Sequence, residues 1–358
     1  MDETEQLLKE LSEAHGVPGY ENEVRALVHC RLRGVGDIER DNVGSLICRN
    51  GAGGPRVMLA AHLDEIGLMV SHITEEGALR FATLGAWWGQ VLLGQRVLVK
   101  TQRGDLSGVI GAKPPHLIPQ DKRGKAPEFK EMYIDIGASS AGQAEEAGVR
   151  PGDPVVPDSS FKAILDGSVY MGKAFDDRVG VAVMVEVMQH FAAASHPNIL
   201  FGTATVMEEV GLRGAKTAAE KVDPDVAIIL EIDFCGDVPG IRPEESSVKL
   251  GGGPSLVLLE ARMIPNILFR DLAIETAREQ GIPLQFSAWS VGSTDGGQIH
   301  LHRTGVPTIV LGVPARHIHG HSGIISRKDY DRTLQLVTAL VAKLDTNTVS
   351  RFTRDDIS

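Results

Sequence analysis

Two adjacent glutamates, Glu208 and Glu209, are the residues whose types and spacing most clearly indicate chemistry in this sequence. They follow an apolar segment that begins at Ile199, where a buried strand is expected to end. Two carboxylates this close repel each other, and one retains its proton unless a cation lies between them. The pair therefore suits a site in which Glu209 binds a metal ion and Glu208 acts as general base on a water.

A histidine and an aspartate two positions apart, His62 and Asp64, follow the apolar run Arg56–Ala61. Residues two apart on a strand point to the same side, so these two side chains can lie together. A carboxylate beside a metal-bound imidazole fixes the tautomer of the ring and raises its basicity. A lone histidine at a strand end is more often structural, but the His-x-Asp spacing supports metal binding.

A pair of aspartates, Asp176 and Asp177, opens the apolar helix expected over Val179–Phe191. Aspartate is a favoured N-cap residue, and one aspartate is enough for that purpose. Two aspartates followed by Arg178 leave one to cap the helix and the other to bind a metal.

Two further groups of possible ligands occur later in the chain. Glu231 and Asp233 follow another buried strand, and three histidines alternate at His317, His319 and His321. Imidazole and carboxylate ligands suit zinc, cobalt or manganese. Because ligands of open α/β sheets gather at the carboxyl ends of the strands, these groups predict a site for two divalent ions.

The elements that would position these groups alternate between strand and helix at both ends of the chain. This alternation predicts an α/β/α sandwich with a mainly parallel sheet, formed by residues 1–69 and 165–358. Residues 70–164 instead show short strands separated by Gly and Pro, which predicts an inserted small β-barrel domain for oligomerisation or access. Within it, Trp87 and Trp88 are each expected in the barrel core, with an oligomer contact as the alternative. Residues 121–125 are expected to form an exposed loop.

The composition excludes several classes of protein. A net charge of −11 over 358 residues argues against nucleic acid as the main partner, since phosphate binding needs a basic surface. No apolar run is long enough to span a membrane, and the first 16 residues indicate an amphipathic helix rather than a signal peptide. Three scattered cysteines disfavour a disulfide framework, so a cytoplasmic protein is expected.

Beyond these local signals, longer motifs are similar to those of a known family. The chain resembles the tetrahedral (TET-type) aminopeptidases, the glutamyl-aminopeptidase and cellulase-like group of dinuclear metallopeptidases. The resemblance runs nearly from end to end and rests on the following motifs: AHLDEIG at 61–67, LLGQRV at 92–97, GVIGAKPPH at 108–116, YIDIGASS at 133–140, GVRPGDPV at 148–155, GKAFDDRVG at 172–180, MEEVGLRGA at 207–215, GDVPG at 236–240, STDGGQIH at 293–300 and VPARHIH at 313–319.

The resemblance implies roles for individual residues. It implies Glu208 as general base and Asp64 as the residue that orients a histidine ligand. The implied metal ligands are His62, Asp176 as the bridge, Glu209, Glu231 and His319. Asp233 is the alternative to Glu231, which follows its strand directly and aligns without a gap, and His321 is the minor alternative to His319. His300 and Asp295 are expected to shape the pocket wall without binding metal.

The implied function is an aminopeptidase that hydrolyses the N-terminal residue of peptides through a water bridging two divalent metals (Zn, Co or Mn). The implied assembly is a homo-oligomer, with dimers forming a tetrahedral dodecamer. One alternative keeps the metals but acts as a deacylase or amidase on small N-acyl substrates. A glycoside hydrolase, which needs two opposed carboxylates without metal, and a non-enzymatic metal-dependent assembly protein are weaker alternatives.

Overall fold

An eleven-stranded sheet forms the core of the larger domain in this computed structural model, which describes residues 1–122 and 124–353. The strand order is β1-β2-β12-β3-β13-β16-β17-β11-β10, with β14 beside β16 and β15 beside β14. The strands are β1 (Asp37–Arg40), β2 (Leu46–Asn50), β3 (Arg56–His62), β10 (Lys162–Ile164), β11 (Val169–Gly172), β12 (Ile199–Thr205), β13 (Val226–Phe234), β14 (Ser255–Leu259), β15 (Gln285–Ala288), β16 (Thr308–Arg316) and β17 (Gly323–Ser326).

The centre of this sheet is parallel. Strand β3 pairs in parallel with β12 and β13, and β13 pairs in parallel with β16. Most outer pairs, such as β1 with β2 and β16 with β17, are antiparallel, whereas the outer strand β15 pairs in parallel with β14. The predicted α/β class with a mainly parallel sheet is confirmed, and the antiparallel pairs are confined to its flanks.

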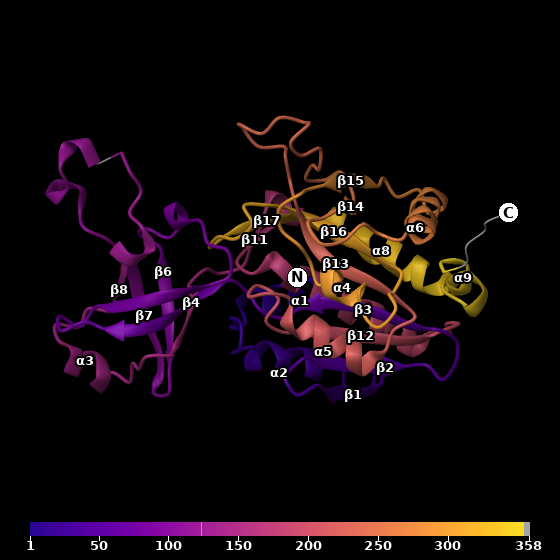
Figure 1. The fold of residues 1–358 in the computed structure, drawn as a ribbon, viewed down its shortest axis with the longest axis horizontal. Coiled ribbons are helices and arrows are strands. Elements are labelled where there is room, and N and C mark those ends of the chain that lie inside the picture. Colours follow the sequence, from indigo (N-terminus) through magenta and orange to yellow (C-terminus); the bar gives the residue numbers. More distant parts are fainter. Residues whose placement is uncertain (123, 354–358) are drawn as a thin grey trace.

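Helices cover both faces of the sheet (Figure 1). Along β3, Val57 and Leu59 belong to the core shared with α1, α4 and α8, whereas Met58 and Ala60 belong to the core on the side of α5. This alternation explains why the strand is apolar throughout: both of its faces are buried. The helices are α1 (Glu3–Glu13), α2 (Asn22–Arg31), α4 (Phe175–Ala193), α5 (Arg213–Val222), α6 (Ile267–Glu279), α7 (Gly296–Ile299), α8 (Arg327–Lys343) and α9 (Thr346–Arg351).

A second domain lies to one side of this sandwich, at the left of Figure 1. It is a closed antiparallel barrel in the order β4-β5-β8-β7-β6-β9, with a short helix α3 (Ala141–Glu146). Its core includes Leu68, Val97 and Ile110. The strands are β4 (Gly67–Ile73), β5 (Leu79–Leu84), β6 (Arg96–Thr101), β7 (Gly104–Gly111), β8 (Tyr133–Asp135) and β9 (Pro154–Pro157).

The two neighbouring tryptophans of the barrel have different environments. Trp87 is buried, and its Nε1–H donates to the carbonyl of Gly67 at 2.9 Å. Trp88 is 63% exposed, so the core expectation is correct for Trp87 and wrong for Trp88. Because exposed apolar surface can mark a site of protein–protein contact, the alternative of an oligomer contact stays open for Trp88.

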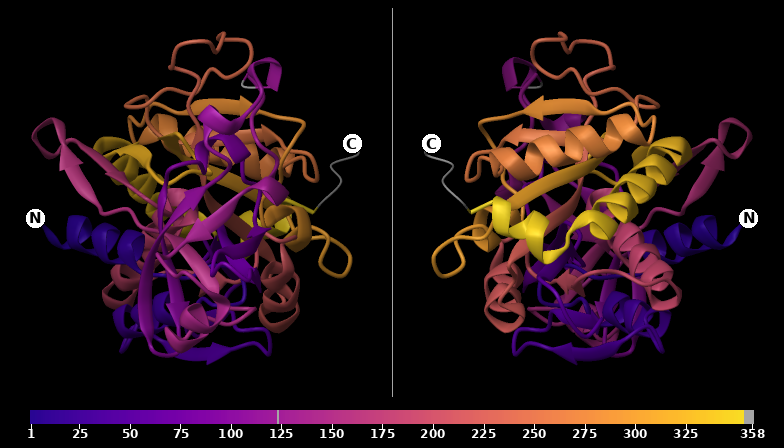
Figure 2. Two further views of the ribbon diagram at one scale, coloured as in Figure 1. Left: turned by 90° about the vertical axis from the view of Figure 1, so that its left-hand side faces the viewer. Right: turned by 90° about the vertical axis from the view of Figure 1, so that its right-hand side faces the viewer.

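The remaining segments complete the frame around the sheet. The side views in Figure 2 show the hairpin of β10 and β11 projecting from the sandwich near the N-terminal helix. Of the exposed loop expected over 121–125, residue 123 lies outside the described residues. Throughout residues 1–122 and 124–353, none of the helices combines the length and apolar character that a membrane crossing requires.

Candidate metal centre

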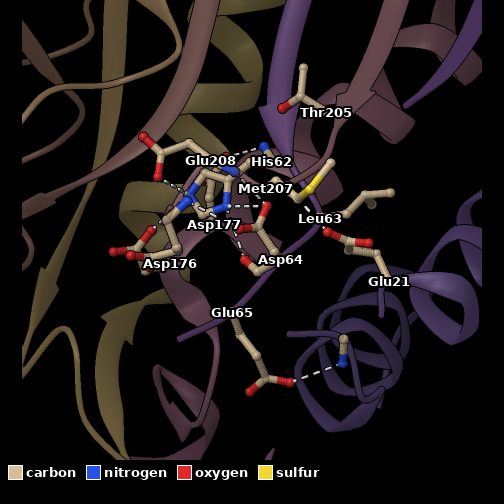
Figure 3. A network of polar contacts seen from close by, with 12 residues as sticks. Glu21, His62, Leu63, Asp64, Glu65, Asp176, Asp177, Thr205, Met207 and Glu208 are labelled. Atoms are coloured by element: carbon tan, nitrogen blue, oxygen red, sulfur yellow. Dashed lines mark hydrogen bonds and ion pairs between the residues drawn. The ribbon is translucent and has the colours of Figure 1, made fainter. Parts of the chain in front are cut away.

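Histidine and carboxylate side chains converge at the carboxyl end of the parallel strands (Figure 3). His62 is the last residue of β3, Glu208 and Glu209 follow β12, and Glu231 lies near the end of β13. Asp176 joins them from the start of α4. The topology thus places residues from four separate segments at one edge of the sheet, as expected for a site in an open α/β fold.

His62 lies at the centre of the cluster and is 2% exposed. Its Nε2 lies 3.1 Å from Asp176 Oδ1, 3.6 Å from Glu231 Oε1 and 4.0 Å from Glu208 Oε2. Its Nδ1 lies 2.9 Å from the backbone carbonyl of Asp64. Since a carbonyl only accepts hydrogen bonds, Nδ1 carries a hydrogen and Nε2 is the ring atom that faces the carboxylates.

The carboxylate of Asp64 serves a different purpose from the one expected for it. Its two oxygens accept hydrogen bonds from the backbone N–H groups of Glu208 and Glu209, both at 3.0 Å. Oδ1 lies 3.7 Å from His62 Nδ1, beyond hydrogen-bond distance. Asp64 therefore orients His62 through its carbonyl and fixes the backbone of the glutamate pair through its side chain.

The two aspartates of α4 divide their contacts. Asp177 Oδ1 accepts from the N–H of Gly180 at 3.1 Å, and its Oδ2 accepts from the N–H of His62. Asp176 instead lies between two imidazoles, with Oδ2 3.2 Å from His319 Nε2. Burial raises the pKa of Asp176, but hydrogen bonds from His319 and His62 have the larger combined effect, so its pKa lies below the ordinary value.

His319 occupies the opposite side of Asp176 from His62. Its Nδ1 donates to the carbonyl of Ala86 at 3.1 Å, so its Nε2 also faces the cluster, 3.5 Å from Glu209 Oε1. Ala86 belongs to the segment between β5 and β6, which means that the barrel holds one ring of the cluster in place. Burial lowers the pKa of His319, but Asp176 and Glu209 offset this and raise it to about 9.

The three glutamates of the cluster have raised pKa values. Burial is the main cause that raises the pKa of Glu208, Glu209 and Glu231, and neighbouring carboxylates such as Asp176 add to it. For Glu209 the pKa rises to about 8. Without a cation in its midst, such a cluster holds protons that it would otherwise release.

Glu231 and Asp233 lie on the same face of β13 but in different surroundings. Glu231 reaches the cluster, and its Oε2 also accepts from the N–H of Ile232 at 3.0 Å. Asp233 is 2% exposed and is absent from both groups of described residues that could hold a metal ion. Burial raises its pKa to about 6.

The other candidate residues belong to neither group of described residues that could hold a metal ion. His317 is exposed, and the ring of His321 lies against Trp87, with a distance of 5.6 Å between the ring centroids. We expected Asp295 and His300 at the pocket wall, but neither is among the described residues that line the cavity beside the cluster. Asp295 instead accepts a hydrogen bond from the hydroxyl of Thr205, and the neighbouring residue Thr294 lines the cavity.

The cluster has the ligand types and spacing that a divalent ion needs. Two groups, His62 with Asp176 and Glu209 and His62 with Asp177 and Glu231, have ligand atoms within 4.8 Å of one another. Glu209 Oε1 is buried without a hydrogen-bond partner in the described chain. Because the carboxylates outnumber the imidazoles and retain protons, these residues fit divalent cations.

A buried ion cluster that our reading of the sequence missed lies beneath the site. Arg178 is 1% exposed and donates to the carbonyls of Leu63 at 2.6 Å and Leu11 at 2.7 Å. Lys173 Nζ lies 2.6 Å from Glu65 Oε1. These contacts fasten α1 and the end of β3 to the start of α4. The partners are over 100 residues apart in sequence, so the motif around Asp176 carries no local signal for them.

A second missed residue is Glu21, at the start of α2. Its carboxylate is buried and accepts from the N–H of Gly19 at 2.7 Å and of Met207 at 3.2 Å. Met207 has a φ of 56°, an unfavourable conformation for a side chain of its type. Glu21 thus stabilises the turn that presents Glu208 and Glu209.

Comparison with known proteins gives matches over most of the chain. Residues 44–336 match the family model described as M42 glutamyl aminopeptidase, and residues 2–27 match a model named AMPT. The Escherichia coli protein FrvX is 40% identical over 352 residues, which cover 98% of each chain. The lysyl aminopeptidase of Pyrococcus furiosus is 34% identical, over 95% of this chain and 97% of that protein.

Solved structures agree with the fold. The TET aminopeptidase from a marine sediment archaeon (Thaumarchaeota) is 48% identical, with a TM-score of 0.97 over 98% of this chain and 99% of that chain. The TET1 peptidase of Pyrococcus horikoshii, described as assembling into a tetrahedron or a large octahedral shell, is 32% identical. Its TM-score is 0.87 over 95% of this chain and 100% of that chain.

Proposed function

The chain belongs to the M42 glutamyl aminopeptidase family, and on that premise we propose that its histidine–carboxylate cluster is the dinuclear metal centre at which the enzyme removes N-terminal residues from peptides. One observation carries the proposal: Asp176 presents one oxygen to His62 and the other to His319. A carboxylate in this position suits a bridge between two ions.

The ligands divide into two sets around this bridge. In our proposal His62, Asp176 and Glu231 hold one ion, and Asp176, Glu209 and His319 hold the other. Both imidazoles donate through Nδ1 to backbone carbonyls, which leaves Nε2 for the metal. Zinc, cobalt and manganese all suit this ligand set. The bound ions would supply Lewis acidity that makes water nucleophilic near neutral pH and polarises the scissile carbonyl.

Glu208 is the group that we propose moves the proton. It lies 4.0 Å from His62 Nε2 and is buried, and burial raises its pKa. A carboxylate with a raised pKa accepts a proton more readily, so Glu208 would take it from the attacking water and deliver it to the leaving amine. Asp64 keeps Glu208 in position through the backbone. The free α-amino group of the substrate would be held by the carboxylates of the proposed ligands. Only the peptide bond after the first residue would then reach the centre, which limits cleavage to that residue.

Several further statements belong to the same proposal. We predicted an inserted domain over residues 70–164, whereas the strands of the barrel run from Gly67 to Pro157 and residues 162–164 form β10 of the large sheet. The barrel would serve assembly and access, since it holds His319 through Ala86 and exposes Trp88. Homo-oligomers up to a tetrahedral dodecamer are proposed because solved relatives include a dodecamer and a tetrahedral TET1 assembly. The three cysteines are free, which supports a reducing cytoplasm as the location.

A chelation experiment tests the function. Metal-free enzyme should not cleave aminoacyl p-nitroanilides, and zinc, cobalt or manganese should restore cleavage. N-acetylated versions of the same substrates should remain uncut, because they lack the free amine. Cleavage of N-acetylated substrates only would indicate the deacylase alternative instead, and a glycosidase activity that survives chelation would contradict the metal mechanism.

A further inference from the structure

A cavity of about 480 Å³ extends from the proposed metal centre. It is lined by Glu208, Glu209 and Glu231 of that centre, and the rest of its wall includes Asp233 and Trp289. If the scissile bond lies at the metals, the side chain of the residue to be removed must occupy the rest of this space. The chemistry of this remaining wall therefore selects the substrate. This inference rests on the proposed function.

Asp233 is the unusual group on that wall. It is 2% exposed, yet neither of its carboxylate oxygens has a hydrogen-bond partner among the described residues. Burial raises its pKa, and the hydroxyls of Ser287 and Ser255 and the backbone N–H of Phe234 lie close enough to lower it in part. None of them makes a full hydrogen bond to Asp233, however, and Ser255 donates to the carbonyl of Gly312. A buried carboxylate without a donor is costly, and a donor on the substrate would relieve that cost.

The position of Asp233 suits the end of a long side chain. It lies two residues beyond Glu231 on the same face of β13, which places it about 7 Å further along the strand. The four-carbon stem of a lysine covers a comparable span. Asp233 also belongs to neither group of described residues that could hold a metal, so its charge is not committed to the ions.

The walls between the metals and Asp233 are largely apolar. Phe234 and Trp289 line the cavity with their ring centroids 6.3 Å apart, and Val291 and Ile318 line it as well. Lysine and arginine combine an apolar stem with a cationic head, so they match apolar walls that lead to a carboxylate. An aromatic ring beside the stem adds apolar contact area.

One cation on the same cavity opposes this match. Arg262 lines the cavity and would favour an acidic substrate. Its side chain is exposed, however, so solvent and salt screen its charge, whereas Asp233 is fully enclosed. The buried charge has the larger effect on a side chain that enters the cavity.

We propose that Asp233 is the specificity-determining residue of this enzyme and selects peptides whose N-terminal residue is lysine or arginine. The side-chain cation of that residue donates to the carboxylate of Asp233, which turns toward the cavity to receive it because both of its oxygens are enclosed in the free protein. The stem of the substrate residue lies against Trp289 and the other apolar lining residues. Neutral residues enter the same cavity without this contact, and acidic residues are repelled from it.

A substrate panel on the metal-loaded enzyme tests the assignment. Lysyl, arginyl, leucyl and glutamyl p-nitroanilides are compared for the wild type, Asp233→Asn and the control Glu244→Gln, which removes an exposed charge on the loop after β13. We expect Asp233→Asn to lower the lysyl-to-leucyl ratio of kcat/KM roughly tenfold to a hundredfold, the range for a lost hydrogen bond to a charged group. Leucyl cleavage and bound metal should stay within about twofold, and the control should match the wild type.

Other outcomes would overturn the assignment in distinguishable ways. A wild type that prefers the glutamyl substrate would make Arg262 the dominant charge. An equal loss on all substrates in Asp233→Asn, with metal retained, would place Asp233 at the α-amino group instead. A loss of metal would place it in the metal centre. If the variant does not fold, competitive inhibition of the wild type by free lysine and by leucine still decides, since equal inhibition contradicts the proposal. Absence of cleavage on the whole panel by the metal-loaded wild type would contradict the proposed function itself.

Discussion

Two hydrogen bonds to backbone carbonyls determine which ring nitrogens of His62 and His319 face the carboxylates of the candidate site. The carbonyl of Asp64 and the carbonyl of Ala86 each accept from a histidine Nδ1, and this turns both Nε2 atoms toward Asp176. The carboxylate of Asp64 then holds the two glutamates by their backbone. A motif shows that these residue types are present, but the atom that each one uses became visible only in the folded chain.

The first prediction concerns the proposed general base. Glu208→Gln keeps the shape of the side chain but removes its ability to accept a proton. We expect bound metal to remain, because Glu208 is not among the proposed ligands, while kcat falls by about 10²–10⁴-fold, the usual contribution of general base catalysis. Metal analysis and steady-state kinetics check this. Near-normal turnover in a metal-loaded variant would remove Glu208 from this role.

At the scale of elements, apolar patterns predict most of the framework. The runs at Arg56–Ala61 and at 225–230 correspond to β3 and β13, and the apolar helix over Val179–Phe191 lies within α4. Each of these patterns reflects burial of the segment itself, so sequence alone is enough. The contacts of Arg178 with Leu11 and Leu63 and of Glu21 with Met207 could not be predicted, because they join segments more than 100 residues apart.

The second prediction concerns the way α1 is attached. Arg178→Met leaves the carbonyls of Leu11 and Leu63 without their donor and removes a cation beside Glu65. We expect the free energy of unfolding to fall by about 3–5 kcal/mol, as for one partner lost from a buried ionic cluster. Urea unfolding of the metal-free protein measures it.

A partly exposed ion pair that also attaches α1, in this case to α2, offers the control. Arg31 in α2 pairs with Glu10 in α1, and both side chains are about one-third exposed. Arg31→Met should change the free energy of unfolding by less than about 1 kcal/mol, because solvent screens surface pairs. Equal losses in the two variants would mean that burial is not what makes Arg178 important.

The third prediction concerns pH and the long segment between β13 and β14. Arg316 in β16 donates to Asp237 at 3.0 Å and holds the pKa of that carboxyl below its ordinary value of 3.8. The unfolded chain therefore binds more protons than the folded chain as the pH falls below this value, and the pair loses its stabilising effect there. Above it the effect is complete.

Comparison with Asp237→Asn isolates this single group. We expect the wild type to exceed the variant in unfolding free energy by about 1 kcal/mol at neutral pH, a modest value because both side chains are partly exposed. The difference should shrink toward zero as the pH falls below about 3.8. A gap that stays constant with pH would show that the ion pair is not its source.

At the scale of the whole molecule, the barrel contributes contacts to the candidate site in the sandwich. It supplies the carbonyl of Ala86 to His319, and it places Trp87 against His321. Its outer surface carries Trp88 in an exposed position. The barrel thus connects the geometry of the proposed metal centre to the surface that is available for assembly.

The fourth prediction concerns that surface. Light scattering should give a mass near twelve times that of the chain if the proposed assembly forms. Trp88→Glu should shift the population to smaller species, because a charge in a buried interface is costly. The control is Glu145→Lys, at an exposed position in α3 of the same domain that does not line the hollow beside Trp88, and it should leave the mass unchanged. A wild-type mass equal to one chain would contradict the assembly.

The spread of the candidate ligands along the chain has a consequence for biosynthesis. His62 lies near the start of the sequence, whereas His319 follows β16 close to its end, and β16 must pair with β13 before that histidine is in place. Domains fold as units while the chain emerges from the ribosome, N-terminal parts first. A growing chain therefore carries an incomplete centre until nearly all of it has been made. In the proposed site, metal binding and peptide cleavage would then await the nearly complete chain.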